Sequence, residues 1–199
     1  ERSMAHIDPL AREDLAELEP GFELVEQIMG FVPNSMLTMA RVPGLLPAFQ
    51  GLGAVVLANP IIARDLAQMV AMMSSVGSGC RYCQAHTGHT AERMGVSPEK
   101  LEAIWTFETS EHFSEAERAA LRIAFHSSQQ PNAATSTDFD AAREYYSDDE
   151  IAAIVAVCSF FGYLNRWNDT MATTLEDSPR HFGETVIASN GWSGDRHSD

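Results

Sequence analysis

Three observations about the sequence predict an all-α fold. Apolar residues recur at the helical period along most of the chain, and no stretch of useful length alternates apolar and polar residues as a half-buried strand would. Glycine and proline residues interrupt these periodic segments where helices would end. Ser114, followed by Glu115 and Glu117, has the composition of a helix N-cap with an acidic first turn. We therefore expect one all-α domain over residues 1–199.

The expected helices follow one another with short breaks. The segment 61–76 is apolar on nearly every face, so we expect it at the centre of the fold. The apolar run in 148–172 is bounded by acidic and polar residues and is shorter than the roughly 18 residues that a membrane span needs, which predicts a buried core helix. Helices are expected over 9–20, 21–30, 35–41, 44–57, 61–76, 97–107, 114–129, 136–146 and 148–172.

The C-terminal segment differs from the rest of the chain. Residues 30–173 should form the core, whereas residues 175–199 are polar and irregular in pattern. We expect this tail to dock on a neighbouring subunit. Its expected anchors are Phe182, Val186, Ile187 and Trp192.

An internal repeat is suggested when the two halves of the chain are aligned. The alignment places Cys80 on Asn165 and Cys83 on Asn168, and each copy would hold an apolar helix, a glycine break and a second helix start. Duplication of a helix-pair unit and chance similarity between two buried helices both remain open. If the duplication holds, Trp167, Asn168 and Asp169 would lie at the helix start equivalent to that of the cysteines and line a cleft near the pseudo-twofold axis. Otherwise Trp167 belongs to the core, and Asp169 caps a helix or pairs locally.

Charge and cysteine content narrow the class of protein. The chain has 13 basic and 28 acidic residues, a net charge of −15, which disfavours nucleic acid and anionic membranes as partners. Three cysteines in a chain of this size do not suggest a secreted disulfide framework. We therefore expect a cytoplasmic protein.

The strongest chemical signal is SGCRYCQAHTGHTAERMGV, residues 78–96. It predicts a helix with Cys80 and Cys83 in its first turn, where unpaired N–H groups and the helix dipole favour a thiolate. At about 100° per residue, His86 lies nearer to Cys83 than His89 does, and His89 lies opposite Cys80. His86 is therefore the expected base for Cys83.

Three interpretations of this cysteine pair are open. A redox dithiol fits two cysteines at a helix start beside a base, and we favour it. A zinc site would need two further ligands, and His86 and His89 share one helix, so they cannot both complete a tetrahedron with both cysteines. The pair could also be inert and buried, as we expect for Cys158 in its apolar helix. We expect no metal and no cofactor.

With these motifs, the chain resembles the carboxymuconolactone decarboxylase superfamily, in particular its alkyl hydroperoxidase D-like, peroxidase-related branch. The resemblance lies in 30–49, 66–87 with its Cys-x-x-Cys, and 151–173. It implies an alkyl hydroperoxidase D-like helical bundle, assembled as trimers or hexamers, with the site in a cleft near a subunit interface. It also implies that Cys83 attacks a hydroperoxide, and that Cys80 resolves the resulting sulfenic acid as a disulfide and exchanges with a dithiol or thioredoxin-like electron donor.

The proton relay of the best-studied members is absent here. Its Glu, His and His positions match Gln68, Tyr82 and Thr87 in this chain. His86, one residue before the position of the last relay histidine, is the substitute that we expect.

These observations predict a thiol-dependent hydroperoxide reductase with peroxiredoxin-type activity. One alternative is a thiol–disulfide oxidoreductase or redox-regulated interaction protein, which the missing relay motivates. A further alternative is a cofactor-free lactone decarboxylase-like lyase, since one fold hosts several chemistries.

Overall fold

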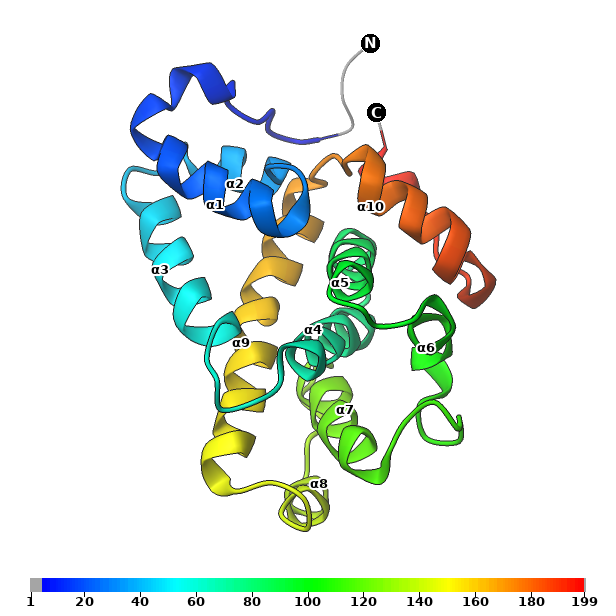
Figure 1. Cartoon of the computed structure of the whole chain (residues 1–199). Helices are drawn as coiled ribbons and strands as arrows, with labels where there is room; N and C mark the ends of the chain where they lie inside the picture. Colours follow the sequence, from blue (N-terminus) through cyan, green and yellow to red (C-terminus); the bar gives the residue numbers. More distant parts are fainter. Residues whose placement is uncertain (1–4, 199) are drawn as a thin grey trace.

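Helix α4 (Arg64–Ser78) lies at the centre of the molecule, as the sequence predicts. Every residue from Leu66 to Ser75 is buried, because neighbouring helices cover all sides of α4. The helices that pack on it most extensively are α5 (Arg81–Arg93), α7 (Glu115–Ser127) and α9 (Asp148–Met171) (Figure 1). This arrangement places the helix that carries the cysteine pair directly against the core.

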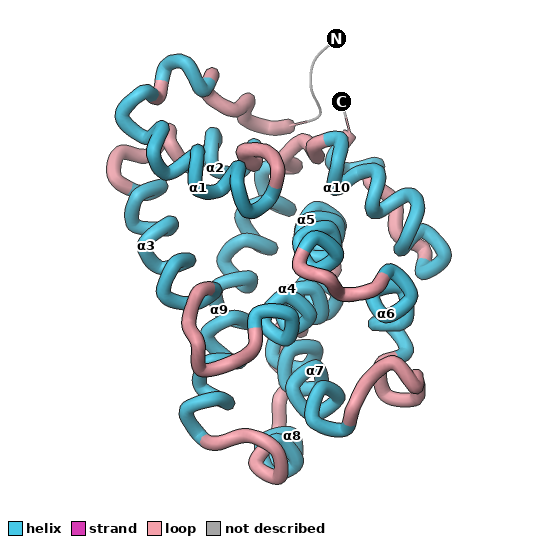
Figure 2. Tube along the Cα trace, viewed as in Figure 1, coloured by secondary structure: helices cyan, strands magenta, loops and turns pink. Residues whose placement is uncertain are grey.

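The computed structural model describes residues 5–198, and that part of the chain contains helices and loops but no strand (Figure 2). The predicted all-α fold is confirmed. The remaining α-helices are α1 (Glu19–Met29), α2 (Asn34–Met39), α3 (Leu45–Leu57), α6 (Pro98–Glu102), α8 (Ser136–Ala142) and α10 (Asp177–Phe182). Short 3-10 turns span Arg12–Asp14, Ala16–Leu18, Ala103–Thr106, Ala188–Asn190 and Asp195–His197, and a π turn spans Gly183–Ile187.

The N-terminal helix expected over 9–20 does not form. Its place is taken by two 3-10 turns, and α1 begins only at Glu19. Pro20 lies in the first turn of α1, where its missing N–H and fixed φ suit a helix start rather than a helix interior.

Reciprocal hydrogen bonds fix the starts of three helices. Ser114 Oγ accepts from the backbone N–H of Glu117 at 3.2 Å, and the Glu117 carboxylate accepts from the N–H of Ser114 at 2.8 Å. The same capping box begins α8 and α9. The cap predicted at Ser114 is therefore confirmed.

Helix α9 runs without interruption through the position where the repeat hypothesis placed a glycine break. Gly162 lies inside α9, and a Cβ at this position would meet nothing within 4 Å. The second copy of the proposed helix-pair unit therefore lacks the break that separates α4 from α5. An open, solvent-facing glycine is simply tolerated in a long helix.

The C-terminal segment packs on its own chain. Phe182, Ile187 and Trp192 are buried, Val186 is half-buried, and α10 lies against α5 (Figure 1). The four expected anchors therefore contact their own chain, and docking of this segment on a neighbouring subunit stays a prediction. The segment alternates between α, π and 3-10 turns. Its apolar residues therefore follow no single helical period, and the sequence pattern does not predict how they pack.

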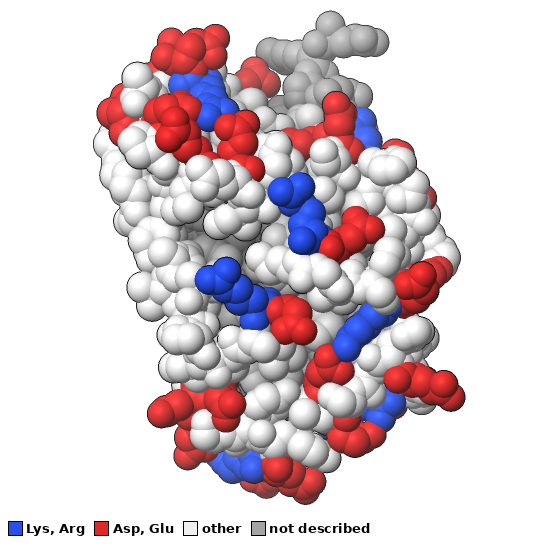
Figure 3. All heavy atoms as spheres, in the orientation of Figure 1, with Lys and Arg blue, Asp and Glu red and all other residues white. Residues whose placement is uncertain are grey.

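The surface carries its acidic groups in clusters. On the face in Figure 3 they gather over α1 and along the rim formed by α8 and the start of α9, and a broad uncharged band covers α3. Within residues 5–198, no helix combines the length and the apolar character that crossing a bilayer demands.

Two glycines provide a matched test of how closely the C-terminal segment packs against α5. A Cβ at Gly88 in α5 would collide with the ring of Phe182 from α10, whereas a Cβ at Gly162 meets open space. We expect Gly88→Ala to destabilise the protein by about 1–3 kcal/mol through overpacking. Gly162→Ala should stabilise it by about 0.5–1 kcal/mol, because alanine loses less backbone entropy in a helix.

Urea unfolding of both variants beside the parent checks this pair of effects. Equal effects of the two substitutions would contradict the close packing of α10 on α5.

Candidate active site

The dithiol, Cys80 and Cys83, lies at the start of α5. Gly79 ends α4 in the left-handed region with a φ of 77°, and Cys80 follows as the N-cap of α5. The backbone N–H of Cys83 points at the Cys80 sulfur, 3.5 Å away. Both cysteines are 2% exposed or less, and neither is in a disulfide. The predicted placement of the pair in the first turn is confirmed.

The two sulfur atoms have different electrostatic surroundings. Burial raises the pKa of the Cys80 thiol well above its ordinary value, and contact with Cys83 and the charge of Asp169 act in the same direction. Cys83 instead receives a hydrogen bond from Nδ2 of Asn168, at 3.4 Å from its sulfur. An N–H aimed at a sulfur atom stabilises negative charge that develops there during a reaction. The thiolate-favouring effect of the helix start is outweighed at Cys80.

A carboxylate network lies one helical turn from Cys83. His86 Nε2 is 2.5 Å from Oε2 of Glu176, and the Tyr82 hydroxyl donates to Oε1 of the same carboxylate at 3.0 Å. The rings of Tyr82 and His86 are stacked with centroids 4.1 Å apart. Glu176 also accepts a 2.5 Å hydrogen bond from the backbone N–H of Asn34. We call Glu176, His86 and Tyr82 the carboxylate network.

Glu176 is ionised although its side chain is largely buried. Burial by itself would raise its pKa, but the charge and hydrogen bond of His86 and the N–H of Asn34 outweigh burial, so the pKa of Glu176 lies below its usual value. The His86 ring is therefore bonded to an ionised carboxylate, one helical turn from the dithiol.

The network changes the interpretation of His86. Within residues 5–198, no hydrogen bond joins His86 to Cys83, and the imidazole is bonded to Glu176 instead. Residues Cys83 and His86 are three apart on one helix and so are neighbours on its surface. His86 is therefore placed to exchange a proton with a molecule bound at Cys83, rather than bonded to the thiol beforehand.

Four other predicted residues have structural contacts. Gln68 is buried in α4, and Thr87 donates its hydroxyl to the carbonyl of Cys83 at 2.7 Å. Trp167 Nε1 donates to Thr38 Oγ1 at 3.2 Å. His89 lies beside Phe31, and burial, with the nearby charges of His86 and Arg93, lowers its pKa. In the described chain, none of the four side chains is hydrogen-bonded to a cysteine sulfur.

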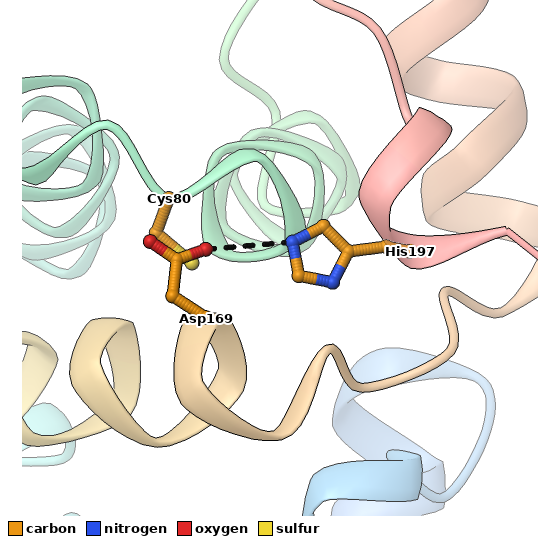
Figure 4. A group of neighbouring side chains, drawn as sticks. All are labelled: Cys80, Asp169 and His197. Carbon is orange, nitrogen blue, oxygen red and sulfur yellow. Dashed lines mark ion pairs between the residues drawn. The ribbon is translucent and has the colours of Figure 1, made fainter. Parts of the chain in front are cut away.

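Asp169, the last of the predicted residues, does lie beside the dithiol. Its carboxylate faces Cys80 from α9 and stands 3.5 Å from Nε2 of His197 (Figure 4). Sequence reasoning missed His197, as it missed Glu176, because both come from the C-terminal segment and no spacing links them to the cysteines.

A lateral cavity of about 650 Å³ opens next to Asp169. It lies between the ends of α4 and α7 and one face of α9. Its size is in the range of small-molecule sites, and Asp169 connects it to the buried dithiol. Its lining residues include Ser78, Ser127, Gln130, Cys158, Asn165, Arg166 and Asp169.

Comparison with known proteins identifies the family. The model of the carboxymuconolactone decarboxylase family matches residues 43–125, which contain α4 and the dithiol. A crystal structure of the debrominase Bmp8 in complex with 2,3,4-tribromopyrrole is 39% identical, with a TM-score of 0.88, over 93% of this chain and 100% of that one. The chain therefore belongs to the carboxymuconolactone decarboxylase family, and its fold is that of the alkyl hydroperoxidase D-like branch.

Other structures support the same fold. The apo form of Bmp8 is 40% identical, with a TM-score of 0.86, over 91% of this chain and 97% of that one. An uncharacterized peroxidase-related protein from Ralstonia eutropha JMP134, described as an alkylhydroperoxidase AhpD core, is 21% identical with a TM-score of 0.79, over 90% of this chain and 96% of that one. No curated protein sequence matched this chain.

The lowered pKa of Glu176 predicts a pH-dependent contribution to stability. A carboxylate whose pKa is depressed on folding stabilises the fold above its unfolded pKa, about 4.3, and loses that effect as the pH falls through the folded value. We expect the parent to be more stable than Glu176→Gln by about 1–3 kcal/mol at pH 7.

This difference should shrink steadily below about pH 4.3. Urea unfolding of both proteins across the acidic range measures it. A difference that stays constant with pH would mean that Glu176 is not ionised in the fold.

Proposed function

We propose that the protein is a thiol-dependent reductase in which Cys80 and Cys83 together supply two electrons. The observation that carries this proposal is the reduced, buried dithiol with the carboxylate network one turn away. A dithiol can transfer two electrons and close a disulfide, and the network can supply a proton to the reduced product. The family includes enzymes of different chemistry, so the substrate class needs a separate argument.

The substrate class that we propose is a brominated aromatic heterocycle of the pyrrole type. Support comes from the 39% identity, over 93% of this chain, with a debrominase whose structure contains a tribromopyrrole. That structure is of a form in which one cysteine is replaced by alanine. In this chain, the cavity beside Asp169 is large enough for such a ring, and Asp169 lies beside Cys80 of the dithiol.

The atoms and electrons of this debromination balance with Cys80, Cys83 and His86 as the reacting groups. The Cys83 thiolate attacks bromine, a sulfur–bromine bond forms, and the electrons of the carbon–bromine bond pass to the ring carbon. That carbon takes a proton from His86, which Glu176 holds in place. Cys80 then attacks the Cys83 sulfur, releasing bromide and its own proton as the disulfide closes. One brominated ring and two thiols thus give the ring with hydrogen in place of bromine, bromide, a proton and a disulfide.

Hydroperoxide reduction is the second candidate, and the Asn168 amide on the Cys83 sulfur favours it. The same donor would stabilise a thiolate attacking an O–O bond and the sulfenate formed from it. One hydroperoxide and two thiols would give an alcohol, water and the disulfide. The peroxidase-related structures are only 21% and 22% identical to this chain, so they support the fold rather than this activity.

A single-turnover experiment separates these candidates. The reduced protein is mixed without oxygen with one equivalent of a brominated pyrrole, across the mono- to tetrabrominated series, or with cumene hydroperoxide. Bromide or alcohol release is compared with disulfide formation by mass spectrometry. We expect equimolar bromide and Cys80–Cys83 disulfide, abolished in Cys83→Ser and unchanged in the control His181→Gln, which changes an exposed histidine in α10.

The His86→Gln variant tests the proton source. We expect it to slow debromination about 100-fold while leaving the alkylation of Cys83 unchanged, since general acid catalysis is typically worth 10²–10⁴. Disulfide formation with the hydroperoxide but with none of the brominated pyrroles would support hydroperoxide reduction. Turnover of a lactone by the Cys80→Ala/Cys83→Ala double variant would contradict both and indicate a lyase.

Repeated turnover requires a reductant for the disulfide. We propose a dithiol or thioredoxin-like donor, since thiol–disulfide exchange is the direct route back to the reduced pair. Assembly into trimers or hexamers remains a prediction of the family resemblance, and gel filtration with light scattering tests it.

A further inference from the structure

Three side chains from separate parts of the chain converge beside the dithiol. Cys80 comes from the start of α5, Asp169 from the last turn of α9, and His197 from the 3-10 turn Asp195–His197. The Cys80 sulfur, a carboxylate oxygen of Asp169 and a ring nitrogen of His197 all lie within 4.8 Å of one another (Figure 4). None of the three belongs to the carboxylate network.

The hydrogen bond of His197 determines what its second nitrogen offers. Nδ1 lies 2.9 Å from the carbonyl oxygen of Thr173. A carbonyl only accepts, so Nδ1 carries the ring proton, and in the neutral ring Nε2 presents a lone pair. His197 is 0% exposed, and Nε2 has no hydrogen-bond partner. It faces Oδ1 of Asp169 at 3.5 Å, so two acceptors face each other and a cation between them would satisfy both.

Backbone contacts hold these groups in place. The carbonyl of His197 accepts from the N–H of Leu175 at 2.7 Å, and its own N–H donates to Gly194 at 2.8 Å. Arg196 donates to the carbonyl of Asp169 at 2.8 Å, which ties the C-terminal turn to the end of α9. A ligand entering this site would meet a preformed set of donor atoms.

We propose that Cys80, Asp169 and His197 bind a zinc ion in the reduced protein. Thiolate, imidazole and carboxylate are all zinc ligands, and three protein ligands with a water in the fourth position is a common zinc arrangement. Bond lengths of about 2.0–2.3 Å in a tetrahedron place neighbouring ligand atoms roughly 3.3–3.7 Å apart. The 3.5 Å between Asp169 and His197 already fits, and the sulfur, which lies within 4.8 Å of both atoms, would move toward them. Asp169 also lines the lateral cavity, which gives the ion a route of entry.

Zinc binding and the redox reaction compete for one sulfur. Cys80 gives up its thiol proton as the zinc–sulfur bond forms, and a zinc-bound sulfur is no longer available to close the disulfide with Cys83. Conversely, a closed disulfide removes the thiolate ligand and releases the ion. Zinc would thus hold the reductase in its reduced, inactive form. This regulatory consequence rests on the proposed function, whereas zinc binding itself does not.

Titration of the untagged, reduced protein with zinc chloride, followed by calorimetry and by competition with a chromophoric chelator, tests the site. We expect one zinc per chain. Asp169→Asn and His197→Asn should each weaken zinc binding about 100-fold or more. Mutation of residues that only hydrogen-bond to metal ligands already lowers metal affinity typically 10–100-fold. His197→Asn retains a donor for the Thr173 carbonyl, so it removes Nε2 with the least disturbance.

Two controls separate this site from others in the chain. His181→Gln changes an exposed histidine in α10, and Cys158→Ser changes a buried thiol that lines the same cavity but lies about three helical turns from Asp169 along α9. Both should bind zinc as the parent does, and the parent oxidised to the disulfide should not bind it. Thermal unfolding checks each variant, and Asp169→Asn, on a partly exposed side chain, still tests the site if His197→Asn does not fold.

Several results would overturn the proposal. They are no stoichiometric zinc in the reduced protein, equal binding by Asp169→Asn and the parent, or equal binding by the oxidised and reduced forms. Each would mean that Cys80, Asp169 and His197 do not form a zinc site. If zinc binds as expected but neither a brominated pyrrole nor a hydroperoxide is reduced, the zinc site stands and the proposed function fails.

Discussion

The rest of the site depends on the hydrogen bonds that the largely buried Glu176 carboxylate accepts. A charge at this depth is tolerated only because Asn34, Tyr82 and His86 all direct hydrogen-bonding groups at it. These partners come from α2 and α5, while Glu176 itself immediately precedes α10. Satisfying one carboxylate therefore fastens the C-terminal segment to α5 and fixes His86 beside the dithiol.

The last turns of α9 create an asymmetry between the two cysteines. Cys83 lies on the side of the carboxylate network, with an amide N–H from Asn168 on its sulfur. Cys80 faces Asp169, whose charge raises its pKa further beyond the effect of burial. Cys83 thus has an amide donor on its sulfur, whereas burial and the charge of Asp169 favour the protonated thiol at Cys80. A nucleophile and a partner that reacts second need this division of roles.

The sequence predicts the parts of the structure that depend on local pattern. The central helix, the long α9 and the dithiol at a helix start all follow from apolar period and capping residues. Glu176 and His197 could not be found this way, because Glu176 lies 90 positions from His86 and no motif connects them. The family resemblance marked Gln68 as a missing carboxylate, and the structure supplies a carboxylate to His86 from a segment whose mixed helical turns hid its packing.

The measurement that tests this account most directly is the nuclear magnetic resonance signal of the His86 ring. In ¹⁵N-labelled protein, the account predicts a strongly downfield, slowly exchanging Nε2 proton on His86, bonded to Glu176. In Glu176→Gln this signal should move upfield and exchange rapidly with water, while the His126 ring, which pairs with Asp138, stays unchanged as an internal control. A His86 signal that is the same in both proteins would contradict the claim that Glu176 organises the site.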